Sequence, residues 1–232
     1  MSQTVLSPSP QAGVSPARTP ERVIPVVLDL GRPLPQIASQ ISLGVPEEGS
    51  AFLGLCAAML RTTPGAQSSA PRALDALRLR GWRSAGALVA QPAEGLAALL
   101  REAGYNGHAA PLARRLHAMA EHLVERWAGA PEALRQASGG QVAALRRLLR
   151  KMPGLGNAAV DSFCQDMQLL WTELYPFAEP RALRAARRLR LGQDAAALAG
   201  NCPREELPRL AAALAQIERQ DGYAMLTQRL SA

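Results

Sequence analysis

The sequence predicts an all-α protein, and three observations support this prediction. Ala, Leu and Arg are abundant whereas aromatic residues make up 4% of the chain, so good helix formers outnumber the residues that favour strands. From Ser50 onward, apolar residues recur at the three- and four-residue spacing of a helix face. Gly and Pro interrupt these segments at short intervals, which is typical of short helices joined by turns. The 232 residues, 48% of them apolar, are enough to bury a core.

The individual helices follow from the same pattern. Ser50 is suited to cap the first helix, and the second has Pro71 in its first turn and Gly81 at its end. The longest periodic segment aligns Leu112, Leu116 and other apolar residues on one face. The predicted helices span residues 50–61, 70–81, 84–91, 92–104, 108–129, 139–152, 157–174, 180–192 and 204–222, and a last short turn is expected around 223–230.

The N-terminal part has a different composition. Residues 1–22 are rich in Ser, Pro and small residues, which predicts a disordered tail. In the next stretch, VIPVVLDLGRPLPQIASQISL, Pro25, Pro33 and Pro35 interrupt apolar runs. We expect extended segments packed over the helical body there, with a short helix near residues 34–43.

The chain is basic, with a formal charge of +7 and a pI of about 10.3. Lys151 is its only lysine, so arginine supplies nearly all of the positive charge. The planar guanidinium fork suits phosphate, which favours a polyanionic partner. Codon composition is the alternative explanation of the many arginines, and charge alone does not decide between the two.

The three cysteines, Cys56, Cys164 and Cys202, lie far apart and form no CxxC pair. This spacing indicates neither a zinc site nor an iron–sulfur cluster, so we expect no metal and no cofactor. Free thiols fit a reducing compartment. No apolar run approaches the roughly 18 residues of a membrane span, and the N-terminus does not resemble a signal peptide. The sequence therefore predicts a soluble cytoplasmic protein without a membrane partner.

The stretch LRKMPGLGNAAVDSF, residues 149–163, predicts two helices joined by a tight Pro-Gly-Leu-Gly turn. Gly154 and Gly156 let the backbone approach a ligand closely, and the free N–H groups at the start of the second helix point outward. Such a turn binds phosphate through its main chain. By spacing alone, an ordinary helix-helix connection remains the alternative.

The helix predicted at 180–192 carries Arg181, Arg184 and Arg188 at helical spacing, opposite an alanine-rich face. We call these three residues the arginine stripe. It is able to follow a phosphate backbone, which would make binding fall steeply with salt. A solvated basic face is the alternative interpretation.

The pattern L-x-x-M-P-G-L-G-x-x-x-V-x-x-F resembles the helix-hairpin-helix of the DNA-repair glycosylase superfamily that includes endonuclease III and the adenine glycosylases. Segments 57–77, 103–129 and 175–191 resemble other parts of that family, in consistent order over residues 50–225. The resemblance implies two helical lobes with duplex DNA in the cleft between them. The lobe that contains the helix-hairpin-helix, a six-helix barrel, would span residues 50–165, and the other would combine 23–49 with 166–232.

The resemblance also assigns roles to residues. It implies DNA contacts by the hairpin residues and the arginine stripe, helped by Arg61 at the position of the family's wedge residue, which is Gln. The catalytic Asp of the family aligns with Glu179, whose side chain is one methylene longer. The alternative is that Glu179 only precedes Pro180 at a helix start, where the helix dipole favours a negative side chain. The predicted hairpin contacts are Lys151, Pro153, Gly154, Leu155, Gly156 and Asn157.

Two departures limit the chemistry. The family's lyase lysine is replaced by Ala158, and Schiff-base chemistry needs an amine. The four closely spaced cysteines of the family's cluster are missing. The resemblance therefore predicts a monomeric, cytoplasmic DNA glycosylase, nucleoid-associated in a prokaryote, that releases a damaged or mismatched base without cutting the strand. A non-catalytic DNA-binding relative is the alternative, so the sequence leaves open whether the protein is an enzyme.

Overall fold

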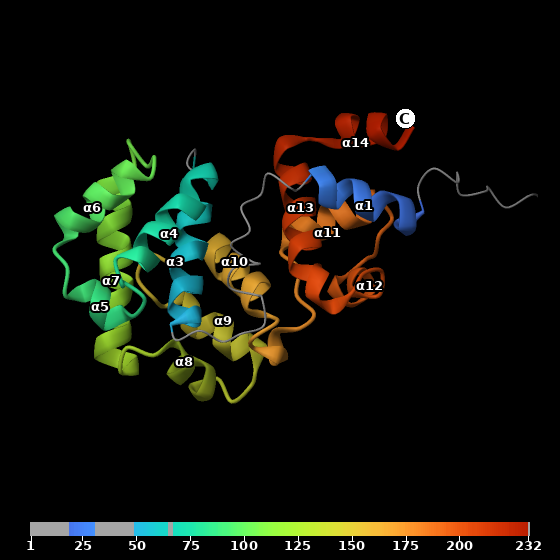
Figure 1. The fold of residues 1–232 in the computed structure, drawn as a ribbon. Coiled ribbons are helices and arrows are strands. Elements are labelled where there is room, and N and C mark those ends of the chain that lie inside the picture. Colours follow the sequence, from blue (N-terminus) through green and yellow to red (C-terminus); the bar gives the residue numbers. More distant parts are fainter. Residues whose placement is uncertain (1–18, 31–48, 65–66, 232) are drawn as a thin grey trace, which may run out of the picture.

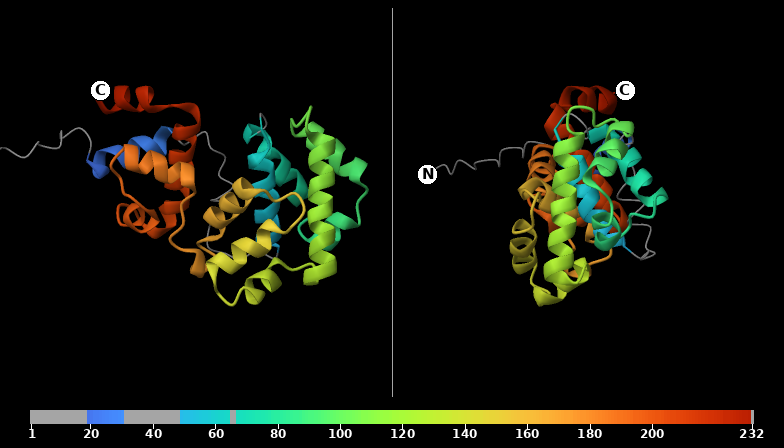
Figure 2. Two further views of the ribbon diagram at one scale, coloured as in Figure 1. Left: turned by 180° about the vertical axis from the view of Figure 1, so that it is seen from behind. Right: turned by 90° about the vertical axis from the view of Figure 1, so that its left-hand side faces the viewer.

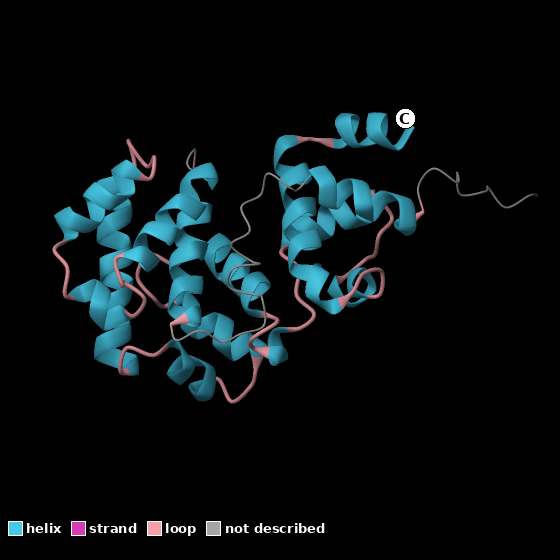
Figure 3. Ribbon diagram, viewed as in Figure 1, coloured by secondary structure: helices cyan, strands magenta, loops and turns pink. Residues whose placement is uncertain are grey.

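The computed structural model describes residues 19–30, 49–64 and 67–231 of the chain. Over these residues the chain forms helices and turns and no strand, as Figure 3 shows. The all-α prediction is confirmed. None of the described helices combines the length and the apolar character that crossing a membrane requires.

One group of helices, here called the first lobe, surrounds α3 (Ser50–Thr62). Every residue from Ala51 to Leu60 is buried, so α3 runs through the middle of this core (Figure 1). The buried residues of the lobe extend to Leu174. The other helices of the first lobe are α4 (Ala70–Leu79), α5 (Ala85–Val89), α6 (Ala93–Glu102), α7 (Ala109–Trp127), α8 (Pro131–Ala137), α9 (Val142–Arg150) and α10 (Asn157–Met167).

Close packing of α10 on α3 depends on a glycine in α3. A Cβ at Gly54 would lie 3.0 Å from the Met167 sulfur and 3.4 Å from the Phe163 ring. Phe163 in turn meets Trp171 edge-on, with ring centroids 5.2 Å apart. The absent side chain therefore lets α10 lie directly against α3, and these two helices form one wall of the site described below.

A second group of helices, here called the second lobe, has a separate buried cluster. It combines segments from both ends of the chain, and the two groups are also distinct in the left-hand view of Figure 2. Arg229 forms an ion pair with Asp29 at 2.6 Å, which joins the last helix to the first. The helices of the second lobe are α1 (Pro20–Leu30), α11 (Pro180–Arg188), α12 (Ala195–Ala199), α13 (Leu207–Gln220) and α14 (Tyr223–Ser231).

The extended conformation expected from residue 23 onward is wrong for residues 23–30, which belong to helix α1. Helix α1 already begins at Pro20, so the end of the predicted 1–22 tail is helical as well. Val23, Ile24 and Val27 are buried in the second lobe, whereas Pro25 is exposed. Burial of this apolar face outweighs the hydrogen bond that Pro25 removes. Residues 1–18 and the short helix expected near 34–43 lie outside the described residues.

The other predicted helices are present with shifted ends, the short turn expected around 223–230 is helix α14, and two short helices were not predicted. Helices α8 and α12 have seven and five residues, too few to show a helical period. The helix predicted at 157–174 ends at Met167. The N–H of Trp171 bonds back to the Met167 carbonyl oxygen at 2.7 Å, and the chain turns there so that Trp171 packs on Phe163.

Candidate functional site

The turn between α9 and α10 depends on the left-handed backbone of one glycine. Gly154 has φ of +81°, which a residue with a Cβ adopts only at a cost. A Cβ there would lie 2.8 Å from the Met59 methyl group and 3.2 Å from the Arg115 carbonyl oxygen. Arg115 also donates a 2.7 Å hydrogen bond to the Gly154 carbonyl oxygen. Gly154 therefore seats the hairpin on α3 and α7.

The second glycine of the turn faces solvent. Gly156 precedes α10, is exposed, and has no atom within 4 Å of an added Cβ. Within the described residues, the backbone N–H groups of Gly156, Asn157 and Ala158 have no hydrogen-bond acceptor. Free N–H groups at a helix start, together with the helix dipole, favour an anion.

The other hairpin residues differ in exposure. Lys151, at the end of α9, and Pro153 are exposed, as expected of residues that contact a partner. Leu155 is only 4% exposed and packs in the core of the first lobe. Leu155 therefore anchors the turn, and only its backbone remains for the predicted contact.

A pocket of about 280 Å³ lies where the two lobes meet. Residues from the end of α3 and from α10 form one side, and residues from the start of α11 and from α13 form the other. Its volume is near the lower end of the range for small-molecule sites, roughly 300–1,000 Å³. The polar and charged residues that line it are Arg61, Thr62, Ser162, Gln165, Glu179, Arg181 and Arg219, and Ala158 lies among them.

Glu179 is the only acidic residue among those that line the pocket in the described part of the chain. Burial raises the pKa of its carboxyl group, and the positive charges of Arg219, Arg181 and Arg61 oppose that rise. Within the described residues its carboxylate has no hydrogen bond and no ion pair within 4.0 Å. An unpaired, partly buried carboxylate with a raised pKa is suited to act as a base or to stabilise a nearby cation.

Gln165 of α10 and Gln168, which follows this helix, fix the backbone around Glu179. The Gln165 side-chain oxygen accepts a hydrogen bond from the Glu179 N–H at 3.3 Å. The Gln168 amide bonds both the N–H and the carbonyl oxygen of Phe177, at 2.9 and 3.0 Å. Both glutamines are buried, at 3% and 0% exposure. The segment that carries Glu179 is therefore attached to the first lobe although α11 belongs to the second.

Arg61 is held against α10. Its guanidinium donates hydrogen bonds to the Ser162 hydroxyl and to the carboxylate of Asp166, which is fully buried. Burial raises the pKa of Asp166, whereas the Arg61 charge and hydrogen bond lower it. The wedge role expected of Arg61 requires this pair to open, since a guanidinium bound to Asp166 is not free to enter a duplex.

The arginine stripe is divided by its contacts. Arg181 lines the pocket. Arg184 forms an ion pair with Glu218 at 2.9 Å, and Arg188 lies 3.8 Å from Asp221 and stacks on the Tyr223 ring. The structure therefore brings Arg181 together with Glu179, but it directs Arg184 and Arg188 to residues of the second lobe.

Sequence reasoning missed Gln165, Asp166, Gln168 and Arg219. The first three lie in the predicted helix 157–174, where they had no recognisable motif, and Arg219 lies far along the chain in α13. Their roles depend on how α10 and α13 are turned toward each other. A local period does not encode that rotation, so no signal in the sequence could have singled them out.

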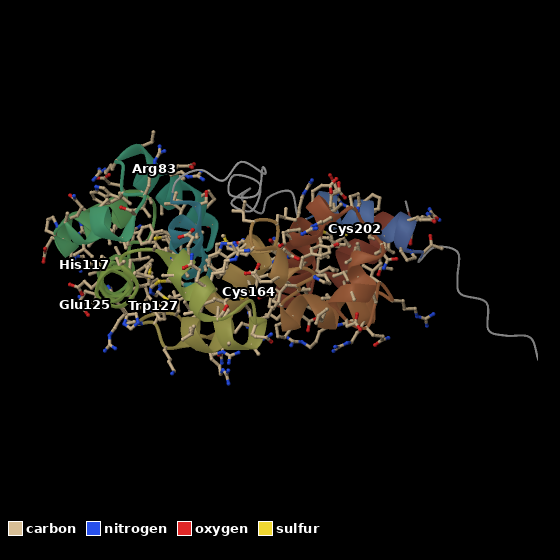
Figure 4. All side chains as sticks on the ribbon, turned by 90° about the horizontal axis from the view of Figure 1, so that it is seen from below. Arg83, His117, Glu125, Trp127, Cys164 and Cys202 are labelled. Atoms are coloured by element: carbon tan, nitrogen blue, oxygen red, sulfur yellow. The ribbon has the colours of Figure 1, made fainter. Side chains whose placement is uncertain are left out.

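The cysteines do not converge. Cys56 and Cys164 are buried in the first lobe, whereas Cys202 lies in the second lobe, as Figure 4 shows for the latter two. Burial raises the pKa of Cys56, and it raises that of Cys164 to about 12. Over the described residues, no group of three or more His, Cys, Asp or Glu side chains is placed to hold a metal ion.

No protein-family model matches the chain, and no curated protein does. One solved structure with a similar arrangement is that of a trapped endonuclease III–DNA covalent intermediate, an estranged-adenine complex. The similarity covers 87% of this chain and 87% of that one, with 16% sequence identity and a TM-score of 0.49.

Proposed function

We propose that the protein binds duplex DNA and hydrolyses the N-glycosidic bond of a nucleotide that is extruded into the pocket, with Glu179 as the catalytic carboxylate. The observation that supports this proposal most directly is the pocket itself. It combines an unpaired Glu179 with the start of α10, so the anion-binding turn and the carboxylate are neighbours.

The hairpin supplies the DNA contact. We place a phosphate at the free N–H groups of Gly156 and Asn157, with Lys151 on the same hairpin and Arg181 at the pocket. These contacts carry no sequence information, but they set the position of the duplex. A base within a duplex is inaccessible to the pocket, so the target nucleotide has to leave the stack.

Glu179 supplies the chemistry. As the base leaves, positive charge develops on the sugar, and an ionised carboxylate nearby stabilises it. The same carboxylate accepts a proton from the attacking water, for which a raised pKa is an advantage. No lysine lines the pocket within the described residues, and Lys151 is exposed at the end of α9. We therefore propose a hydrolytic reaction without a lyase step.

The alternative is a DNA-binding protein without catalysis. The observation that favours it is the Arg61–Asp166 pair, which holds the expected wedge residue against α10. A protein that does not insert a residue into the duplex has less to offset the cost of extruding a base. In either case we propose a monomer that acts where the DNA is, at the nucleoid in a prokaryote.

The experiment uses duplexes that contain an oxidised pyrimidine, uracil, an alkylated purine or an A·8-oxoguanine pair. Each is incubated with the protein and then treated with alkali, which cuts the strand where a base has been lost. We expect base loss from at least one duplex, abolished by Glu179→Gln and retained in Glu125→Gln, a matched change at an exposed residue of α7. Tight binding with no base loss from any duplex supports the non-catalytic alternative.

A further inference from the structure

The pocket contains more positively charged side chains than the proposed reaction by itself requires. Arg61, Arg181 and Arg219 line it together with Glu179. Arg61 is neutralised by Asp166 behind it. The two positive charges of Arg181 and Arg219 therefore exceed the one negative charge of Glu179. The pocket thus favours a ligand that accepts hydrogen bonds or carries negative charge.

Arg219 is a free donor. It lies near the end of α13, and within the described residues its guanidinium has neither a hydrogen bond nor an ion pair within 4.0 Å. Partial burial and the neighbouring arginines lower its pKa, whereas Glu179 raises it. Arg184 and Arg188, by contrast, have acidic partners. A guanidinium left without a partner at the edge of a pocket is available to a ligand.

Gln165 is a second free donor, and it is almost fully buried. Its side-chain oxygen is used by the Glu179 N–H, but its side-chain nitrogen has no acceptor among the described residues. The side chain is 3% exposed and lines the pocket. That nitrogen is not enclosed by protein atoms, so a ligand oxygen in the pocket is able to accept its hydrogen bond.

The lining also excludes one class of base. No aromatic side chain lines the pocket within the described residues, so a cationic alkylated base has no ring to stack on. Arg181 and Arg219 would repel it as well. A base that presents a carbonyl oxygen meets donors instead.

We propose that Arg219 and Gln165 together hold a carbonyl oxygen of the extruded base, and that Arg219 stabilises the negative charge which that base acquires as it leaves. This inference rests on the proposed function. The C1′–N bond breaks with its electron pair on the base, and the oxygen of water bonds to C1′. The water proton passes to Glu179 and then to solvent, and the released base anion takes a proton from solvent. Arg219 thus acts on the base and Glu179 on the sugar.

The binding test uses two duplexes that differ at one position. One carries a tetrahydrofuran abasic analogue, and the other carries 2′-fluoro-2′-deoxyuridine, whose glycosidic bond resists cleavage, opposite guanine. Arg219→Lys keeps the charge but loses the planar fork. We expect its affinity for the 2′-fluorouridine duplex to fall about tenfold or more, with little change for the tetrahydrofuran duplex. Arg209→Lys, at an exposed residue of the same helix, is the matched control.

Gln165→Glu keeps the oxygen that accepts from the Glu179 N–H and removes the donor. We expect this variant also to lose affinity for the 2′-fluorouridine duplex and to bind the tetrahydrofuran duplex as the wild type does. Equal losses for both duplexes, or none in either variant, overturn the base contact and leave DNA binding in place. A wild-type protein that binds neither duplex overturns the proposed function instead, so the two failures are distinguishable.

The charge on the leaving base is tested by single-turnover rates at saturating protein, on the duplex from which the wild type releases a base. We expect Arg219→Lys to slow base release at least tenfold even when all of the duplex is bound, and Arg209→Lys to leave the rate unchanged. An unchanged rate in Arg219→Lys overturns the proposal that Arg219 stabilises the leaving base.

Discussion

At the scale of single residues, the site is defined by which side chains are left without partners. Arg61, Arg184 and Arg188 are engaged by carboxylates, whereas Glu179 and Arg219 are not. Folding normally pairs charged groups as they become buried. Leaving these two charges unpaired costs stability, but it leaves both side chains able to bind a ligand.

The raised pKa of Glu179 gives a prediction for stability. Because the folded-state pKa is raised, this carboxyl group binds protons more readily in the folded protein than in the unfolded chain. Its ionisation thus lowers stability as pH rises from the ordinary glutamate pKa, about 4.3, through the raised value. We expect Glu179→Gln to unfold at a higher temperature than the wild type at pH 8, and the difference to disappear near pH 4.

Thermal unfolding followed by circular dichroism measures this difference. The pH dependence of base release is a second measurement, since the proposed function makes the ionised carboxylate the active form. The rate should rise with pH at values above the ordinary range for glutamate. A lower melting temperature for Glu179→Gln at pH 8 would contradict the prediction.

At the scale of elements, the two glycines of the hairpin have different roles. Gly154 needs a left-handed backbone and has no room for a Cβ, whereas Gly156 has φ of −77° and open space around it. A sequence pattern treats both as part of one motif. Only the first is required by the fold, and only the second lies where a phosphate could approach.

We predict opposite results for substitutions at these two glycines. Gly154→Val should lower the free energy of unfolding by at least about 1–2 kcal/mol, because valine is strained at positive φ and would also meet Met59. Gly156→Leu should unfold like the wild type, yet bind duplex DNA about tenfold more weakly, since its side chain blocks the N–H groups of α10. Urea denaturation and fluorescence anisotropy measure the two effects.

Gly86→Leu, at an exposed glycine of α5 with no atom within 4 Å of an added Cβ, is the matched control for binding. Its DNA affinity should equal that of the wild type. Undiminished affinity in Gly156→Leu would mean that the start of α10 makes no contact with DNA.

The first turn of α10 also allows a gain of function. Ala158 lines the pocket with Arg181, Arg219 and Glu179, so a lysine introduced there would have its pKa lowered because two positive charges outnumber one negative charge. A neutral amine is the form that produces a Schiff base. We expect Ala158→Lys, but not the wild type, to be trapped by borohydride on a duplex that contains an abasic site. Absence of trapping would place the abasic carbon out of reach of residue 158.

The elements show where prediction from sequence succeeds and fails. Helices such as α7 and α13 were predictable because they are long and carry a clear apolar face. Glu179 could be selected because it precedes a helix in a recognisable segment. Arg219 and Gln165 could not be selected, since they line the same pocket only because α13 faces α10. The contacts that set this arrangement are distant in sequence.

At the scale of the whole molecule, the net charge of +7 overstates the positive charge that is available to a polyanionic partner. Some arginines bond within the protein: Arg135 binds Glu173 through two hydrogen bonds, and Arg146 pairs with Asp161. A calculation from composition alone counts these charges as available. The structure leaves a smaller set around the hairpin and the pocket.

The difference between paired and available basic side chains predicts the salt dependence of DNA binding. Lys151→Gln should reduce the slope of log affinity against log salt by about 0.9, the value for one lost phosphate contact. Arg184→Gln should leave the slope unchanged and lower stability by at most about 1 kcal/mol, because its exposed pair with Glu218 is broken. Titrations at four or more salt concentrations measure both slopes. A reduced slope in Arg184→Gln would place Arg184 at the DNA.

The position of helix α1 affects the order in which the two lobes can fold. This helix is synthesised long before α13 and α14, against which it packs. The first lobe draws its core from one continuous stretch and can fold on the nascent chain. The apolar face of α1 therefore stays uncovered until α13 and α14 have been synthesised.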